Sequence, residues 1–338
     1  MQISIGKLAA TGVAAATAMA VALPATAAMT TLKVSSCLAR NHDQVEAYFA
    51  TFHEPLNKMS EQTGLKLNYI GGPEVTPRQK QAAAVKRGLI DIINCPSAYY
   101  QTLVPEARVA GVNNVGPAEL RKNGGFELLQ EGWKKGLNAR ILGWGHWEAS
   151  TFFIYTKFEP KTDTVTGIDL TGRKMRSTGL YNAFLKKMKA TPVNISPGDV
   201  YAALERGVVD GLAWPEGSIA KYGWERFLKY KITPNFFHST TMTIINLKKY
   251  NSLTQVQRDA LDKQGLIFEK ESNGILAAKS VEDNKKLAAA GIKDIDLTGD
   301  VGKAYLDTIY GAKWEANDKV KYKVDYKMLK DKVFRPGS

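Results

Sequence analysis

With 338 residues, of which 44% are hydrophobic, the chain is long enough for one large or two medium domains with buried cores. Its formal net charge is +13, and the excess lysine is spread along the chain without any nucleic-acid-binding motif, so we expect no nucleic-acid partner. The summed positive field favours anionic ligands instead. No segment beyond residue 28 is apolar enough to cross a bilayer, which excludes a multi-span membrane protein.

The chain opens with one lysine, an uncharged apolar run and then Ala25-Thr26-Ala27, a small-x-small cleavage pattern. This arrangement is typical of a secretory signal peptide. The alternative is a membrane anchor, but the apolar run at 8–23 is short, rich in alanine and not followed by basic residues. We therefore expect residues 1–28 to be a cleaved signal peptide and the mature protein to act outside the cytoplasm.

Strands are predicted to alternate with helices along the mature chain, which favours an α/β fold with largely parallel sheets. The first unit is a strand at 32–36, a long helix at 43–62 and a strand at 65–70. A second helix is framed by Thr76 as N-cap, Pro77 at its first position and Gly88 after its end, and a strand at 89–94 follows.

Two cysteines lie at predicted strand ends, Cys37 and Cys95. If the two strands are neighbours in a parallel sheet, the sulfur atoms meet at the same rim and can form a disulfide, provided that the Cα atoms fall within the narrow range a disulfide allows. The alternative is two unpaired thiols. Nothing supports a catalytic cysteine, because no histidine is locally placed to activate either thiol.

The same plan of helix, glycine and strand recurs later, at residues 196–213. The matching pairs are Pro77 with Pro197, Gly88 with Gly207, and Asp91 with Asp210. Any two helix-to-strand turns share some features, but the spacing favours two lobes of similar build. Because sheets of this kind bind ligands outside the carboxyl ends of their strands, both rims are expected to face one cleft.

Two extended passages connect the lobes, at 141–157 and 232–247. They imply that the lobes exchange strands, which suits hinge closure around a ligand. After the second passage, residues 253–293 are strongly helical, and the basic tail from residue 300 is helical again. We expect lobe 1 to comprise residues 29–148 plus 241–281, and lobe 2 residues 149–240 plus 282–338.

A cation and an aromatic residue are brought to one rim of the second lobe. Arg176 lies near the end of a short strand, and Trp214 ends the strand that follows two units later. A guanidinium is always charged and matches both oxygens of a carboxylate, so this pair indicates a site for a small organic anion. Strand alternation alone does not place Arg176 inward, and the alternative is one more surface cation.

Other candidates surround this rim. For these candidates a structural role is the alternative: the tryptophans can fill the hinge, and the histidine can make a structural hydrogen bond. The crossing passage offers Trp144, His146 and Trp147, the first lobe offers Tyr99 and Tyr100, and Glu216 is the carboxylate nearest to Trp214.

Several short stretches of the sequence resemble the DctP-type periplasmic solute-binding proteins of TRAP (tripartite ATP-independent periplasmic) transporters. The strings are DLTGRKMR at 169–176 and VYAALERGVVDG at 200–211, with Gly72-Pro73, Gly88 and Asp91 in the first unit. The resemblance implies a two-lobed periplasmic-binding-protein-like α/β fold, in which each lobe is a mostly parallel sheet flanked by helices. It also implies that the protein captures an organic acid and passes it to a membrane permease, and that Arg176 pairs with the ligand carboxylate.

The chain departs from the family pattern at two places. Most members have asparagine at the position of Trp214, whereas a subset that binds keto or hydroxy acids has tryptophan with an acidic residue just before it that helps to hold a metal. Here that residue is Ala213, so we expect neither metal nor cofactor. Many members also carry a second arginine on the crossing strand, where this chain has no basic residue before Lys157.

We therefore expect a single-arginine site for a monocarboxylate with an apolar or aromatic body, in a protein that is a monomer and not an enzyme. The alternatives are a binding protein of an ABC importer, a sensor ectodomain for an organic anion, and, least favoured, an exported enzyme. An enzyme needs a nucleophile with its base, a carboxylate pair or a metal set, and the four histidines have no metal-ligand spacing.

Overall fold

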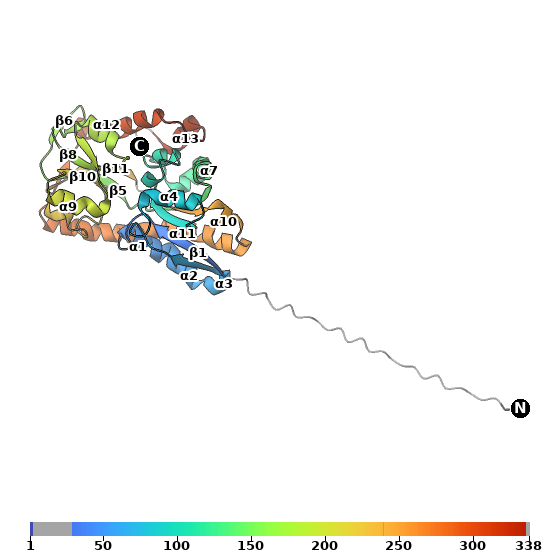
Figure 1. Cartoon of the computed structure of the whole chain (residues 1–338). Helices are drawn as coiled ribbons and strands as arrows, with labels where there is room; N and C mark the ends of the chain where they lie inside the picture. Colours follow the sequence, from blue (N-terminus) through green and yellow to red (C-terminus); the bar gives the residue numbers. More distant parts are fainter. Residues whose placement is uncertain (3–28, 239, 336–338) are drawn as a thin grey trace.

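A computed structural model of the chain describes residues 1–2, 29–238 and 240–335 (Figure 1). Except for its first two residues, the expected signal peptide lies outside the described residues. Two sheets flanked by helices form two lobes, which confirms the two-lobed α/β fold. We call the five-stranded sheet with its helices the first lobe, and the six-stranded sheet with its helices the second lobe.

The first lobe has the strand order β2-β1-β3-β12-β4. Strand β1 pairs in parallel with β2 and β3, whereas β12 runs antiparallel between β3 and β4. The strands are β1 (Thr30–Ser36), β2 (Leu65–Tyr69), β3 (Ile92–Pro96), β4 (Ala139–Gly145) and β12 (Thr241–Asn246). The helical segments are α1 (Asp43–Tyr48), η1 (Phe49–His53), α2 (Glu54–Lys58), α3 (Ser60–Thr63), α4 (Arg78–Lys86), η2 (Ser97–Tyr99), α5 (Glu106–Ala110), α6 (Pro117–Asn123), α7 (Gly125–Leu137) and α10 (Leu247–Asn251).

The second lobe has the strand order β13-β11-β5-β10-β8-β9. Its pairs β10-β8, β8-β9 and β11-β13 are parallel, and β5 runs antiparallel between β11 and β10. The strands are β5 (Thr151–Thr156), β8 (Lys174–Ser177), β9 (Thr191–Asn194), β10 (Gly211–Pro215), β11 (Tyr230–His238) and β13 (Lys293–Asp296), with a small ribbon of β6 (Lys161–Asp163) and β7 (Gly167–Asp169). The helical segments are α8 (Asn182–Lys187), η3 (Pro197–Asp199), α9 (Val200–Glu205), η4 (Trp224–Arg226) and α12 (Gly299–Asp318).

Three long-range features join the lobes. The chain passes from β4 to β5 and returns from β11 to β12, so each sheet contains a strand that follows directly from the other sheet. The 35-residue helix α11 (Gln255–Ala289) runs along both lobes (Figure 1). Its Phe268 packs in the core of the first lobe, and its Leu287 packs in the core of the second. Finally, α13 (Tyr326–Val333) returns to pack on α7 of the first lobe.

The structure has no membrane-crossing element among the helices that it describes, because none of them is both long and apolar enough.

The repeat seen in the sequence is reproduced in backbone geometry. Gly88 and Gly207 both have left-handed φ angles, 73° and 68°, which let each helix end and turn toward its strand. One Asp91 carboxylate oxygen accepts a hydrogen bond from the backbone of Lys33 at 2.7 Å, and Asp210 does the same for Lys174 at 2.8 Å. Each aspartate thereby fixes the register between its own turn and the neighbouring parallel strand.

The strands after these glycines begin later than the sequence indicates. β3 starts at residue 92 and β10 at residue 211, because the amide groups of Leu89 and Val208 close the preceding helices by bonding to Ala84 and Ala203. Likewise, the structure makes Pro77, not Thr76, the residue that precedes α4, and α4 has no side-chain cap there.

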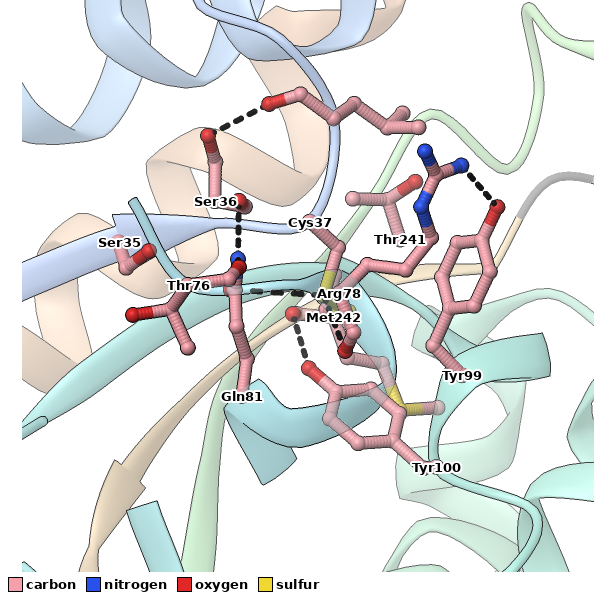
Figure 2. Close-up of a disulfide and its surroundings, with 12 residues drawn as sticks. Ser35, Ser36, Cys37, Thr76, Arg78, Gln81, Tyr99, Tyr100, Thr241 and Met242 are labelled. Carbon is pink, nitrogen blue, oxygen red and sulfur yellow. Dashed lines mark hydrogen bonds between the residues drawn. A yellow bond between two sulfur atoms is a disulfide. The ribbon is translucent and has the colours of Figure 1, made fainter. Parts of the chain in front are cut away.

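Cys37 and Cys95 form a disulfide at the rim of the first lobe, which settles the pairing that the sequence leaves open. Their Cα atoms are 5.0 Å apart and both side chains are buried. Gln81 of α4 lies against the bridge and donates hydrogen bonds to the carbonyl groups of Ser36 and Thr76 (Figure 2). The disulfide and Gln81 together hold β1, β3 and the start of α4 at one point of the rim.

Replacing both cysteines by alanine (Cys37→Ala with Cys95→Ala) is expected to lower the free energy of unfolding by about 4 kcal/mol, because the bridge closes a long loop in the unfolded chain. Guanidinium denaturation of the wild type with and without reductant measures the change. The double variant serves as the control, since its unfolding midpoint should not respond to the reductant. If the unfolding midpoint of the wild type did not respond to the reductant either, the disulfide would be contradicted.

Candidate functional site

The carboxyl ends of strands from both lobes converge on one cleft, which opens to solvent. From the first lobe come the segments that follow β1 and β3, and the residue before β12. They supply Leu38, His42, Gln44, Pro96, Ser97, Ala98, Tyr99 and Thr240. The second lobe supplies Phe152, Arg176, Thr178, Leu180, Tyr181, Pro197, Trp214 and Pro215. We call this space the inner chamber.

Arg176 is the buried cation of the inner chamber. Strand β8 delivers it between β10 and β9, where its side chain is only 1% exposed. Its Nε donates to the backbone carbonyl of Ile195 at 3.0 Å, and the Tyr181 hydroxyl lies in hydrogen-bonding contact with the guanidinium. The guanidinium carbon is 5.0 Å from the ring centre of Trp214, which fixes the cation over an aromatic face.

This guanidinium has no carboxylate within ion-pair distance among the described residues. Burial lowers the pKa of Arg176 below its ordinary value, because desolvation disfavours the charged form. Arginine nevertheless stays protonated in proteins. The inner chamber therefore contains a buried positive charge that no described carboxylate neutralises.

Trp214 forms one wall beside this charge. It lies on β10, is almost fully buried and packs edge-on against Trp224, with ring centres 4.8 Å apart. The ring of His42, from the other lobe, lies 6.2 Å away. Trp214 thus contacts residues of both lobes and shields the guanidinium from water.

His42 adds an uncharged donor to the chamber. Its Nδ1 accepts the backbone N–H of Gln44 at 3.2 Å, which caps helix α1 and leaves the proton of the neutral ring on Nε2. Burial lowers the pKa of His42 to about 4, so the ring is neutral at pH 7. A neutral N–H suits an acceptor atom of a ligand without adding to the charge of the site.

An outer chamber continues the cleft toward solvent and shares Ala98, Tyr99 and Thr178 with the inner one. It contains a second arginine, Arg78, at the start of α4. The guanidinium of Arg78 donates to the Tyr99 hydroxyl at 3.3 Å and lies 5.6 Å from the centre of its ring (Figure 2). It is close enough to Arg176 to lower the pKa of that group. The two chambers therefore contain one arginine each, Arg176 in the inner one and Arg78 in the outer one.

Three of the sequence candidates lie together in the cleft, namely Arg176, Trp214 and Tyr99. The others line neither chamber. Tyr100 is buried beneath the first rim, where its hydroxyl donates to the Met242 carbonyl at 3.1 Å (Figure 2). Trp144 is fully buried in the same core, because its strand is covered on both faces.

The remaining candidates occupy the hinge and the back of the second lobe. His146 has a left-handed φ of 70° and packs edge-on against Phe268 in the core. Trp147 stacks on His238 with ring centres 3.9 Å apart. Glu216 pairs with Lys231 at 3.4 Å and accepts a hydrogen bond from Asn284 at 2.7 Å, so its carboxylate is engaged outside the inner chamber. These geometries fit hinge and packing roles.

No cluster of histidine, cysteine or acidic residues suited to a metal ion occurs in the described part of the chain. The carboxylates and histidines nearest to Trp214 are bonded to lysines, amides or backbone groups.

The lining residues that were not expected from the sequence include Arg78, His42, Tyr181 and Phe152. Arg78 carried a usable signal, because it directly follows Pro77 in the repeated helix that points at the cleft. His42 did too, since it precedes the helix that follows the first strand. The directions of Tyr181 and Phe152 depend on packing between β8, β5 and α8, for which the sequence has no local marker.

Comparison with known proteins identifies the architecture. A family model, DctP, bacterial extracellular solute-binding protein, family 7, matches residues 34–308. A Bordetella pertussis extracytoplasmic solute receptor that binds pyroglutamic acid is 18% identical, with a TM-score of 0.76 over 90% of this chain and 99% of that chain. A TRAP solute-binding protein from Bordetella bronchiseptica RB50, with copurified calcium and picolinate, is 20% identical, with a TM-score of 0.76 over 90% and 92%. One from Roseobacter denitrificans with bound β-D-glucuronate is 18% identical, with a TM-score of 0.73 over 90% and 99%.

The structural matches, all at low identity, establish the fold, and the family match extends over most of the chain. Members of this family are periplasmic solute-binding proteins that bind small organic acids and work with TRAP permeases. They serve transport and are not enzymes.

The stability of the folded protein should fall as the pH falls from 6.5 toward 4. Burial lowers the pKa of His146 from 6.5 to about 3, so in this range the unfolded chain binds a proton that the folded chain cannot. Asparagine tolerates the positive φ at this position. With falling pH, the free energy of unfolding of His146→Asn should therefore decrease less steeply than that of the wild type, by about 1.4 kcal/mol per pH unit.

Urea denaturation of both proteins at pH 4.5, 5.5 and 7.5 measures the difference. The values at pH 7.5, where histidines are neutral in both states, provide the control. Parallel pH profiles for the two proteins would contradict the buried neutral ring.

Proposed function

Because the chain belongs to the bacterial extracellular solute-binding proteins of family 7, we propose that it captures one small organic carboxylate and delivers it to a TRAP membrane permease. The observation that carries the proposal is the buried guanidinium of Arg176, which has no carboxylate partner among the described residues. A carboxylate ligand supplies the missing charge and two acceptor atoms for the planar donors.

The walls of the inner chamber support a ligand with an apolar or aromatic body. Phe152, Leu180 and Pro215 line it together with Trp214, and among the described residues no acidic or lysine side chain does. The space is small enough to surround a compact acid, and a ring could stack on the tryptophan. We infer that the ligand is a monocarboxylate whose charged end meets Arg176 and whose body lies among these apolar groups.

Arg78 adds a reason to favour an anion. It lies in the outer chamber, which adjoins the inner one and opens to solvent, and it has no carboxylate partner within ion-pair distance among the described residues. A cation at the mouth raises the local concentration of anions and speeds their association. We propose that Arg78 attracts the carboxylate and that Arg176 holds it.

We further propose that the protein acts in the periplasm as a monomer, after cleavage of residues 1–28. The lobe boundaries proposed from the sequence are 29–148 plus 241–281 and 149–240 plus 282–338, and the chain passes between the two sheets after β4 and after β11. Closure of these two bodies over the acid is the motion that the proposal requires.

A panel of acids tests the ligand class. Benzoate, picolinate and pyroglutamate are expected to raise the melting temperature, because a ligand at 100 times its dissociation constant adds about 2.7 kcal/mol to the free energy of unfolding. Picolinamide, which lacks the charge, is the matched control and should give no shift. Succinate should give a smaller shift than the monocarboxylates. An equal shift with picolinamide, or a larger one with succinate, would overturn the ligand class, and no shift with any acid would count against the function.

Replacing the buried arginine separates binding from folding. Arg176→Met is expected to weaken binding of the best acid at least about 100-fold, because the carboxylate loses a buried partner. The free energy of unfolding without ligand should stay within about 1 kcal/mol of the wild type or rise, since an unpaired buried charge is removed.

Isothermal titration calorimetry and urea denaturation measure the two quantities. Arg173→Gln is the matched control, because it removes an exposed arginine next to the same strand, whose side chain stacks on Phe158 outside the cleft. Retained affinity in Arg176→Met would show that the arginine does not hold the ligand.

A further inference from the structure

A cluster of charges joins the two lobes directly behind the inner chamber. Asp43, the first residue of α1, belongs to the first lobe and lies next to His42, which lines the cleft. Ser218 and Lys221 belong to the second lobe and follow β10, which carries Trp214. Asp43, Ser218 and Lys279 line a small hollow on the far side of Trp214.

Every contact in this cluster is short. Lys221 Nζ lies 2.7 Å from one carboxylate oxygen of Asp43, and the Ser218 hydroxyl donates to the other oxygen. Lys279 of α11 lies 3.2 Å from Asp43. Glu46, one turn further along α1, accepts from both lysines, at 3.1 Å from Lys221 and 2.7 Å from Lys279.

The loop that brings Ser218 and Lys221 to Asp43 is specially shaped. Ser218 is buried and has a left-handed φ of 69°, which is unfavourable for a serine, and it follows Gly217 with a φ of 90°. Asp283 of α11 accepts the backbone N–H groups of Ile219 and Ala220, at 3.2 and 2.9 Å. The loop is thus held in a conformation that presents its polar groups to the other lobe.

None of the charged groups in the cluster lines the inner chamber. Their contacts join residues 175 and 178 positions apart in sequence, across the boundary between the lobes. Because Asp43 and Trp214 move with different lobes, these contacts must break when the lobes separate. A ligand that bridges the two rims therefore favours the same arrangement as the charges do.

We propose that Asp43, Glu46, Lys221 and Lys279 form an electrostatic latch that stabilises the closed lobes and slows dissociation of the bound acid. The proposal rests on the proposed function. The latch acts on the release rate because none of its charges lines either chamber, whereas Arg78 lines the outer chamber and acts on approach. Its partly exposed lysines make it sensitive to salt.

Stopped-flow fluorescence of Trp214 with picolinate, pyroglutamate and benzoate tests the latch. Asp43→Asn keeps the shape of the side chain but removes the charge that both lysines share, and it should raise the dissociation rate at least about tenfold with little change in the association rate. Lys221→Met should act in the same direction, and Lys221→Arg should restore slow release.

Salt separates a latch from a merely structural contact. The dissociation rate of the wild type should rise between 20 and about 500 mM salt, and that of Asp43→Asn should not, because its charged contact is already lost. Asp307→Asn is the control, since it breaks the exposed pair with Lys303 on helix α12 and should change neither rate.

Small-angle scattering of the ligand-free protein distinguishes failure of the latch from failure of the proposed function. Asp43→Asn and Lys221→Met should have a larger radius of gyration than the wild type. If the wild type binds none of the three acids, the proposed function fails, and this comparison still decides the latch. Unchanged dissociation rates, or, without binding, an unchanged radius in both variants, would overturn the latch.

Discussion

A positive charge is held inside this protein without a negative partner in the described structure, and the cleft is organised around that charge. Moving an ion out of water is costly unless hydrogen bonds and an opposite charge replace the water. For Arg176, part of this lost water is replaced by the Ile195 carbonyl, the Tyr181 hydroxyl and the face of Trp214. These contacts do not supply an opposite charge, so they do not fully replace the lost hydration of the guanidinium. A bound anion is therefore favoured, and the contacts that orient the guanidinium also select the charge of the ligand.

The rims on either side of this charge are fixed by backbone interactions. In the first lobe, the disulfide and Gln81 hold the ends of β1 and β3. In the second, Asp210 fixes β8 against the turn before β10 through the backbone of Lys174, two residues before the arginine. A site held in this way loses little conformational freedom when it binds, and more of the binding free energy remains for affinity.

Much of this arrangement could be predicted from the sequence, because it depends on local rules. The paired positions Gly88 with Gly207 and Asp91 with Asp210 indicated two similar units, and their geometry agrees closely. The order of strands brought Arg176 and Trp214 to one rim. The aromatic candidates were less predictable: nearness in sequence suggested a role for Trp144, but its strand is buried on both faces, so its side chain packs in the core. Arg78 was missed although it directly follows Pro77 in the repeated helix, and its contact with Tyr99 depends on how α4 packs.

The position of β12 has a consequence for how the protein folds. This strand lies between β3 and β4, yet the chain reaches it only after building most of the second sheet. An emerging chain that ends before Thr241 leaves the facing edges of β3 and β4 without their central partner, and exposed strand edges invite wrong pairing with other chains. Neither lobe can therefore mature as an independent folding unit, and the many contacts between distant residues make folding slow. Folding of the binding site is a late, cooperative event in which both lobes complete each other.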